Sequence, residues 1–574
     1  MADTKQHFHL QKAVRHVVAQ TSPYGEQRFT DAMVNLASSL GEDRDPTENH
    51  AATAIVEKSL EPLRWRAREL RKATRSTKFF PNFPVEKSGE LTKAELDVGT
   101  LTDFTQITGG QTLGYVSLDT QVARGTIRPS SFTLYQILDK TMANQIVDYW
   151  PYVLDTGAPP PGAAFSSYNS VGTGSLNTNA GDYELKNVIL KLMVDGRAIT
   201  TALAAQNSFT NIGEQETMNA SLGILSTANW TLYHGDASLY PNQFDGLDTL
   251  IPNDTNHRYD FEDYYNSVGT TNSWSREQAL YNLIYEGASQ LTSYANFGYT
   301  THALMTPNTL AGMQSLVTGV LNNIVNQLTR SMREPIEVNG DLQGMRTRFG
   351  EIQFPLDLLI TARDIPVAAI TNDNGVSKAT ATSPTPPATV TPAVNTGATG
   401  SAFDTTYAGS YVYAVASCDA NMNESTLTVS SSATVAAGDS VTLTIAPPGA
   451  ADASVFRVFR TGLGDTTATS ATPGKFRYIG SVAANGSNNV TFTDLNTHIP
   501  GSETIYLLDM DEQDGAIDYR MLLPLSRIEL FAQNLYSPWA VAMIGALRLR
   551  IPKFHGLIHN IVLPEAGFDP TSTN

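Results

Sequence analysis

The stretch Asn211–Gly235, NIGEQETMNASLGILSTANWTLYHG, carries the signals of one long amphipathic helix. Asn211 is a residue type that favours helix N-caps, and Glu214 suits the positive end of the helix dipole. Gly235 favours termination, so the helix should span roughly 35 Å. Apolar residues at helical spacing predict one buried face. That predicted face consists of Met218, Leu222, Leu225 and Leu232.

Length and composition limit the classes of protein that fit this chain. The 574 residues predict roughly two to four domains. The formal net charge of -18 disfavours a general nucleic-acid binder, which needs clustered basic residues. The single cysteine, Cys418, excludes an intrachain disulfide and a metal site built from several thiolates. The sequence contains no apolar run of signal-peptide or membrane-spanning type, which predicts a soluble protein made in a cytoplasm without a membrane partner.

Residues 1–114 are predicted to be mostly helical and polar. Within them, Val56–Lys78 carries eight basic and three acidic residues, a net charge of +5 in an acidic chain. Such a segment pairs with an acidic protein surface or with nucleic acid, or it forms a solvated helix face. The candidate contact residues are Arg64, Arg66, Arg68, Arg71, Lys72 and Arg75.

Residues 115–194 predict an extended hairpin. The strand-like segment before Asp155 forms one arm of this hairpin, and Tyr183–Val194 forms the returning arm. A long Gly-, Pro-, Ser- and Asn-rich segment lies between the two arms. A loop of this length without a periodic pattern is functional or mobile. Its predicted tip consists of Pro159, Pro160, Pro161 and Gly162.

The rest of the chain predicts an α/β region that is interrupted once. In residues 195–370, Ser275 and Gln278 form a capping-box pattern before a helix, and Pro307 suits another helix start. Residues 371–400 read as an extended Thr-, Pro- and Ala-rich linker. Short β-branched runs over 400–500 predict a β-sandwich, and mixed α/β sequence returns in 501–574. A sandwich inserted in this way should have its own core, so removal of 378–500 should leave its host intact.

Three patterns that suggest chemistry are weak. Asp155-Thr156-Gly157 matches an aspartic-protease tripeptide, but no second copy supplies the partner carboxylate. His555 and His559 are four residues apart in a segment that reads as a strand, without an accompanying Glu motif. Cys418 is expected to be buried rather than reactive. We therefore predict no enzyme activity, no cofactor and no metal.

The order of these elements resembles the major capsid protein of tailed bacteriophages, whose fold is shared with encapsulins. The resemblance implies an α+β, HK97-like capsid fold in which 1–114 is the N-arm and 115–194 is the E-loop region. Residues 195–370 would hold the peripheral and axial domains with the spine helix at 211–235, and 501–574 would complete them. The 400–500 insert resembles the immunoglobulin-like or fibronectin-type modules of some phage proteins.

This resemblance implies a structural protein that assembles into hexamers and pentamers of an icosahedral head around phage DNA. Partners would be further copies of the chain, a portal, scaffold or cement proteins, and packaged double-stranded DNA bound without sequence specificity. The expected location is the virion capsid, after assembly in the bacterial cytoplasm. The segment between Lys140 and Lys186 contains no lysine, so an isopeptide cross-link from the loop tip is not expected.

Two alternatives remain open. An encapsulin-like compartment shell would share the fold but enclose cargo enzymes. A β-sandwich adhesin would use the 400–500 module to bind a ligand, but it does not explain why this module interrupts an α/β region.

Overall fold

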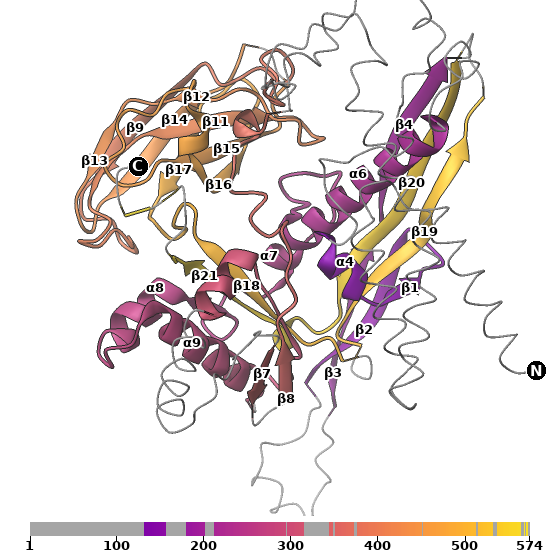
Figure 1. Ribbon diagram of the computed structural model, residues 1–574, viewed down its shortest axis with the longest axis horizontal. Coiled ribbons are helices and arrows are strands. Elements are labelled where there is room, and N and C mark those ends of the chain that lie inside the picture. Colours follow the sequence, from indigo (N-terminus) through magenta and orange to yellow (C-terminus); the bar gives the residue numbers. More distant parts are fainter. Residues whose placement is uncertain are drawn as a thin grey trace, which may run out of the picture. The chain divides into compact units, whose positions relative to one another are not determined.

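The computed structural model describes residues 131–155, 180–200, 212–293, 296–314, 344–347, 350–371, 376–449, 452–511, 515–531, 536–563, 568 and 570–571. The predicted arm 1–114 and the loop tip Pro159–Gly162 lie outside these residues, as do the basic candidates Arg64, Arg66, Arg68, Arg71, Lys72 and Arg75. Their proposed roles stay predictions. The described chain is a mixed α+β structure (Figure 1).

The first sheet is built from strands that are distant in sequence. Its order is β1 (Lys140–Met142), β19 (Ile517–Glu529), β20 (Tyr536–Leu549) and β4 (Lys191–Thr200). The long helix α6 (Ile212–His234) runs along this sheet and packs on β4 and β20 (Figure 1). The helix predicted over 211–235 is thus confirmed.

The predicted buried face of α6 is wrong in part. Ala220, Ile224, Ala228 and Leu232 are buried, whereas Met218 is 46% exposed. Leu222 and Leu225 are only half-buried. The prediction weighed the largest apolar side chains, whereas the buried residues recur every four positions and alternate Ala with Ile or Leu. Only Leu232 belongs to both the predicted and the observed face.

A second sheet has the order β5 (Arg258–Asp260), β21 (Gly556–Ile561), β18 (Glu503–Leu508), β6 (His302–Leu304), β8 (Gly350–Gln353) and β7 (Gly344–Thr347). Helix α9 (Arg276–Leu291) packs against it through Leu283 and Ile284. The predicted capping box is present, because the Ser275 and Gln278 side chains each bond the other's backbone. The host also contains the short helices α4 (Thr133–Ile137), α7 (Leu247–Leu250) and α8 (Phe261–Tyr264) and the π-helix η7 (Tyr265–Gly269). Residues 307–314 are helical as well, so the helix start predicted at Pro307 is confirmed.

Between β8 and β18 of that sheet, the chain forms a run of strands that we call, together with the turn that follows its last strand, the all-β unit, residues 389–499. One sheet has the order β17 (Val490–Asp494), β14 (Ser440–Ala446) and β9 (Thr389–Asn395). The other has the order β12 (Thr428–Val429), β11 (Tyr413–Cys418), β15 (Val455–Arg460) and β16 (Arg477–Ala483), and β10 (Gly409–Tyr411) pairs with β13 (Ala433–Val435). We call the other described residues the host.

Strand β9 falls inside the segment 371–400 that the sequence predicts to be a linker. Its side chains alternate, with Thr389 and Thr391 exposed and Val390 buried against the core of the all-β unit. Pro392 is compatible with this position because β9 is the edge strand of its sheet. The linker boundary is therefore corrected: strand structure begins at Thr389.

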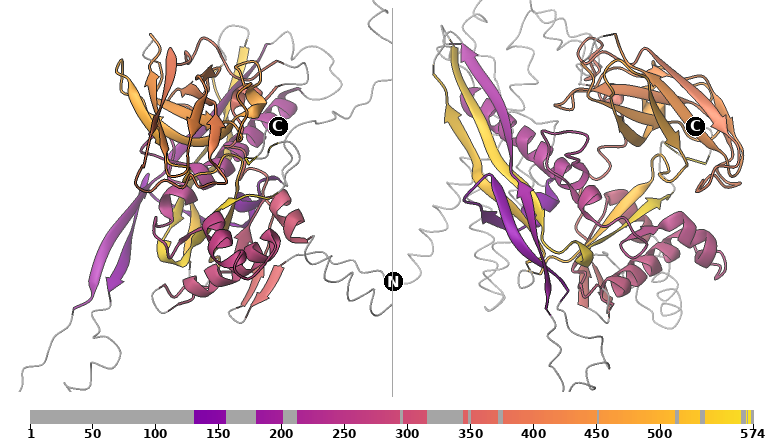
Figure 2. Two further views of the ribbon diagram at one scale, coloured as in Figure 1. Left: turned by 90° about the vertical axis from the view of Figure 1, so that its left-hand side faces the viewer. Right: turned by 180° about the vertical axis from the view of Figure 1, so that it is seen from behind.

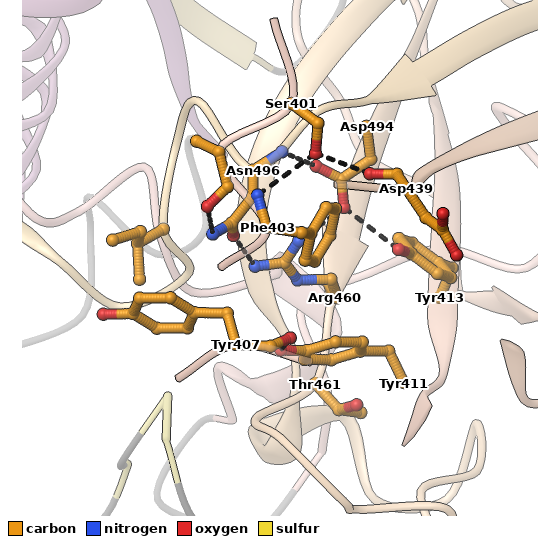
Figure 3. Close-up of polar contacts among 12 residues, drawn as sticks. Ser401, Phe403, Tyr407, Tyr411, Tyr413, Asp439, Arg460, Thr461, Asp494 and Asn496 are labelled. Atoms are coloured by element: carbon orange, nitrogen blue, oxygen red, sulfur yellow. Dashed lines mark hydrogen bonds and ion pairs between the residues drawn. The ribbon is translucent and has the colours of Figure 1, made fainter. Parts of the chain in front are cut away.

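An arginine lies in the core of the all-β unit (Figure 3). Arg460 has no exposed surface and pairs with Asp494 at 2.5 Å. The rings of Phe403 and Tyr411 lie 5.0 and 4.7 Å from its guanidinium. Tyr413 donates a hydrogen bond to Asp494 at 3.0 Å, so the buried carboxylate is compensated on two sides.

Candidate functional site: an exposed apolar hairpin face

The hairpin predicted in 115–194 appears as β2 (Val147–Asp155) and β3 (Asp182–Ile189). The two strands pair antiparallel, with Pro151 opposite Leu185 and Val153 opposite Tyr183. Figure 2 shows this two-stranded ribbon extending from the sheet that carries α6. The segment between the strands, which contains the predicted tip, is outside the described residues.

One face of the ribbon is apolar and open to solvent. Tyr183 is 69% exposed, Leu185 is 67% exposed and Tyr149 is 56% exposed. Since alternate residues of a strand point to the same side, these side chains share one face with Pro151 and Val153. Contiguous apolar surface of this kind marks an interaction site.

The opposite face of the ribbon is fixed to strands β19 and β20 by charged side chains. Asp148 lies 2.8 Å from Arg520 and 2.8 Å from Arg548, which also pairs with Asp518 at 2.6 Å. Burial acts to raise the pKa of Asp148, but hydrogen bonds and charges from Arg520 and Arg548 outweigh it and hold the pKa below its usual value. The neighbouring Trp150 is buried, with the Arg548 guanidinium 5.8 Å from its ring.

Further along the same face, polar side chains satisfy each other. Lys186 lies 4.4 Å from the centre of the Tyr152 ring and 3.8 Å from the Glu184 carboxylate. Burial and the Glu184 charge raise the pKa of the Tyr152 hydroxyl, so it stays neutral. The inward face of the ribbon is thus held by Asp148, Trp150 and Val188, whereas its apolar outer face is free.

A second apolar surface occupies the far end of the sheet. Phe531 is 94% exposed just after β19, and Leu530 and Tyr536 are about half exposed. On β4, Leu192 and Val194 are each 58% exposed. Leu192 pairs with Ile544 and Tyr536 pairs with Thr200, so the exposed residues of β4 lie at the other end of that strand from Tyr536.

The residues that suggested chemistry lie in three different parts of the fold. Asp155 is exposed at the end of β2, which does not suit a buried proton-sharing pair. His555 is buried, and burial lowers its pKa to about 3, whereas His559 lies on β21 at 3.7 Å from Asp260. Within the described ranges, no three His, Cys, Asp or Glu side chains are arranged to hold a metal. Cys418 is buried, as predicted.

The anchor of the ribbon has no sequence signature. Asp148 and Arg520 are 372 positions apart, and neither belongs to a recognisable motif. The only local indication of the anchor is the charged Asp148 among the apolar residues of β2. The alternation of β2 also predicts its two faces but not which of them turns to solvent.

No model of a known protein family matches the chain, and the search of curated proteins finds no significant relative. Among solved structures, the chain is similar to the capsid of a native GTA particle, with 8% identity, 80% of this chain and 98% of that chain covered, and a TM-score of 0.38. The capsid of Cyanophage P-SCSP1u gives 11% identity, coverage of 79% and 95%, and a TM-score of 0.35. The chain is also similar to the holo-SrpI encapsulin complex from Synechococcus elongatus PCC 7942, with 9% identity, 79% of this chain and 96% of that chain covered, and a TM-score of 0.33. Among the described helices, none is long and apolar enough to cross a membrane.

Proposed function

We propose that this chain is a structural shell protein that assembles with copies of itself through the apolar face of the β2–β3 ribbon. The observation that carries the proposal is the exposed apolar face of the ribbon. Its inward face is anchored to β19 through Asp148 and Arg520, while Tyr149, Val153, Tyr183 and Leu185 remain open to solvent. Isolated two-stranded ribbons are marginal in water, so a ribbon with this exposed face gains stability from a partner.

The order of elements supports the finer assignment to a major capsid protein of the HK97-like type. The N-arm would be 1–114, the E-loop region 115–194, and the spine helix α6. We propose that hexamers and pentamers form the shell, with phage DNA inside and portal and scaffold or cement proteins as partners. The all-β unit would be an immunoglobulin-like insert that projects outward. An encapsulin-like compartment is the second candidate, because it would use the same ribbon contact.

Self-association of identical chains needs no strong single contact. Repeated modest contacts in a closed symmetric assembly give avidity. The net charge of -18 suits an inner wall that repels packaged phosphate, which lets DNA move during filling and release. The basic segment Val56–Lys78 is the exception, and we propose that it contacts an acidic surface of a neighbouring subunit. Reversal of charge at Arg64, Arg68 and Arg71 should then stop shell formation, as judged by electron microscopy, and normal shells would rule this contact out.

The test of the ribbon contact is a matched pair of substitutions. Val153 is 48% exposed on the ribbon face, and Val376 is 60% exposed outside it. We expect the purified wild-type chain to form shells or rings by electron microscopy and light scattering. V153D should give folded monomers, because a charge on a buried apolar contact is costly. V376D should assemble like the wild type.

Two results would contradict the proposal. Wild-type chain that stays monomeric up to high concentration would argue against self-assembly through this face. Assembly of V153D at the wild-type concentration would show that the ribbon face is not the contact. Circular dichroism of each variant establishes that the substituted chain is folded.

A further inference from the structure

A line of charged groups runs from the end of α6 toward the all-β unit. The imidazole Nδ1 of His234, the last residue of α6, lies 2.7 Å from Asp248. The guanidinium of Arg363 lies 2.9 Å from the same carboxylate oxygen. The Tyr506 hydroxyl donates a hydrogen bond to the other oxygen of Asp248 at 2.7 Å. Arg363 is thereby held by the host through its side chain.

The backbone that follows this arginine is held by the all-β unit. Arg457 on β15 donates a hydrogen bond to the carbonyl oxygen of Arg363 at 2.6 Å. Glu424, which pairs with Arg457 at 2.5 Å, accepts a hydrogen bond from the backbone amide of Val367 at 2.8 Å. The guanidinium groups of Arg363 and Arg457 lie 4.7 and 5.2 Å from the same Tyr478 ring. The buried Arg457–Glu424 pair therefore binds both a donor and an acceptor of the connecting backbone.

A second attachment lies at the loop that follows α6. Tyr240 of this loop packs with Cys418 and Val455 of the all-β unit in one buried cluster. Beside this cluster, the Asn242 side chain donates a hydrogen bond to the Asn421 side chain at 3.3 Å. The loop is thus in direct contact with the all-β unit, independently of the connecting segment 363–367.

A third attachment lies on the returning chain. Asn560 on β21 accepts a hydrogen bond from the amide of Ile499 at 3.0 Å and donates one to the carbonyl of Thr497 at 3.0 Å. The same side chain donates to Asp260 of the host at 2.6 Å. Ile499 belongs to the apolar core of the all-β unit.

From these three attachments we infer that the all-β unit is a fixed extension of the host and not an independently tethered module. Inserted domains move relative to their hosts unless the interface is extensive or specific. Here the interface is specific, because separation of the units would take the Arg363 carbonyl from Arg457 and the Val367 amide from Glu424, and would remove Arg363 from the Tyr478 ring. Whatever surface the all-β unit presents is then held in one orientation relative to α6. This inference does not depend on the proposed shell function.

One residue can report on the contact between the all-β unit and the host, which we call the joint. Cys418 is its only cysteine, and its side chain is buried against Tyr240. Burial raises the pKa of the thiol to about 12, so reaction with an aromatic disulfide reagent requires opening of the joint or of the all-β unit. The rate of labelling under native conditions therefore measures how often Cys418 becomes accessible.

We would measure this rate in the full chain, using Ellman's reagent, for the wild type, R457M and E424Q. The wild type should be protected relative to chain in denaturant, and each variant should label at least about tenfold faster at unchanged far-ultraviolet circular dichroism. The control is V441A, which weakens the core of the all-β unit away from the joint. V441A should label more slowly than R457M.

Three outcomes would overturn the inference. One is wild-type labelling as fast as in denaturant. Another is unchanged labelling in both R457M and E424Q. The third is equal acceleration in V441A and R457M, which would show that Cys418 is exposed by unfolding of the all-β unit and not by its separation from the host.

Discussion

The backbone amide of Gly246 donates a hydrogen bond to the carbonyl oxygen of Gly235 at 2.8 Å, which ties the loop after α6 back onto the end of that helix. The two glycines are in close backbone contact: a Cβ on Gly246 would lie 2.7 Å from the Gly235 nitrogen and 2.5 Å from the Thr231 carbonyl oxygen. A Cβ on Gly235 would lie 2.2 Å from the Phe244 carbonyl oxygen, so Gly235 also leaves no room for a side chain.

Substitution of Gly246 by alanine should destabilise the chain. The added methyl group would meet backbone atoms, which cannot move aside as a side chain can, so we expect a loss of about 1–3 kcal/mol in the free energy of unfolding. Chemical denaturation followed by circular dichroism measures it. The matched control is G474A, because a Cβ at Gly474 meets no atom within 4 Å. Equal stability of the two variants would refute the close-contact explanation.

A buried carboxylate joins three separate segments of the host. Asp357 accepts hydrogen bonds from Asn229 of α6 at 2.8 Å, from the Tyr233 hydroxyl at 3.0 Å and from the backbone amide of Leu134 at 3.2 Å. Burial, together with the Asp357 charge, raises the pKa of the Tyr233 hydroxyl well above its usual value, so it remains a donor.

D357N should therefore be costly although it preserves shape. Asparagine has a single acceptor oxygen: with that oxygen toward these donors, its NH2 group would face the backbone amide of Leu359, which now donates to the other carboxylate oxygen at 2.9 Å. We therefore expect a loss of about 2–4 kcal/mol in thermal or chemical unfolding. D236N is the control, since Asp236 caps a surface turn that asparagine also accommodates. A loss in D357N no larger than in D236N would show that the buried carboxylate is not required.

The ribbon anchor should make stability depend on pH. The folded-state pKa of Asp148 is depressed, so its contribution is present at neutral pH and is lost as pH falls below about 4 toward the folded pKa. At pH 7, we expect D148N to lose about 1.5–3 kcal/mol, the usual value of hydrogen bonds to charged groups. At pH 3, the difference between D148N and the wild type should shrink.

The control for this effect is D195N. Asp195 also pairs with an arginine at 2.8 Å, but both side chains are about a third exposed, so its loss should cost less than about 1 kcal/mol. Urea denaturation at both pH values gives the two differences. A D148N deficit that is undiminished at pH 3 would contradict the assignment of the effect to the Asp148 charge.

The sequence by itself determined the features that depend on neighbouring residues. The α6 helix, the Ser275 capping box, the two flanking strands of the hairpin and the β-strand content after residue 400 follow from local spacing, caps and turn residues. These patterns reflect interactions within a few positions, which the order of residues states directly. The boundary of the all-β unit at Thr389 was missed because its Thr and Pro content is typical of linkers as well as of edge strands.

Only the tertiary structure decided which faces are buried and how the parts are joined. The Ala220–Ala228 face of α6, the Asp148 anchor and the attachment of Arg457 to the Arg363 backbone each depend on residues that are distant in sequence. The distant partner of a charged or small residue cannot be predicted from its neighbours in sequence, since burial and pairing arise only when the chain is folded. The same physical reason explains why the exposed apolar face of the ribbon could be seen only in three dimensions.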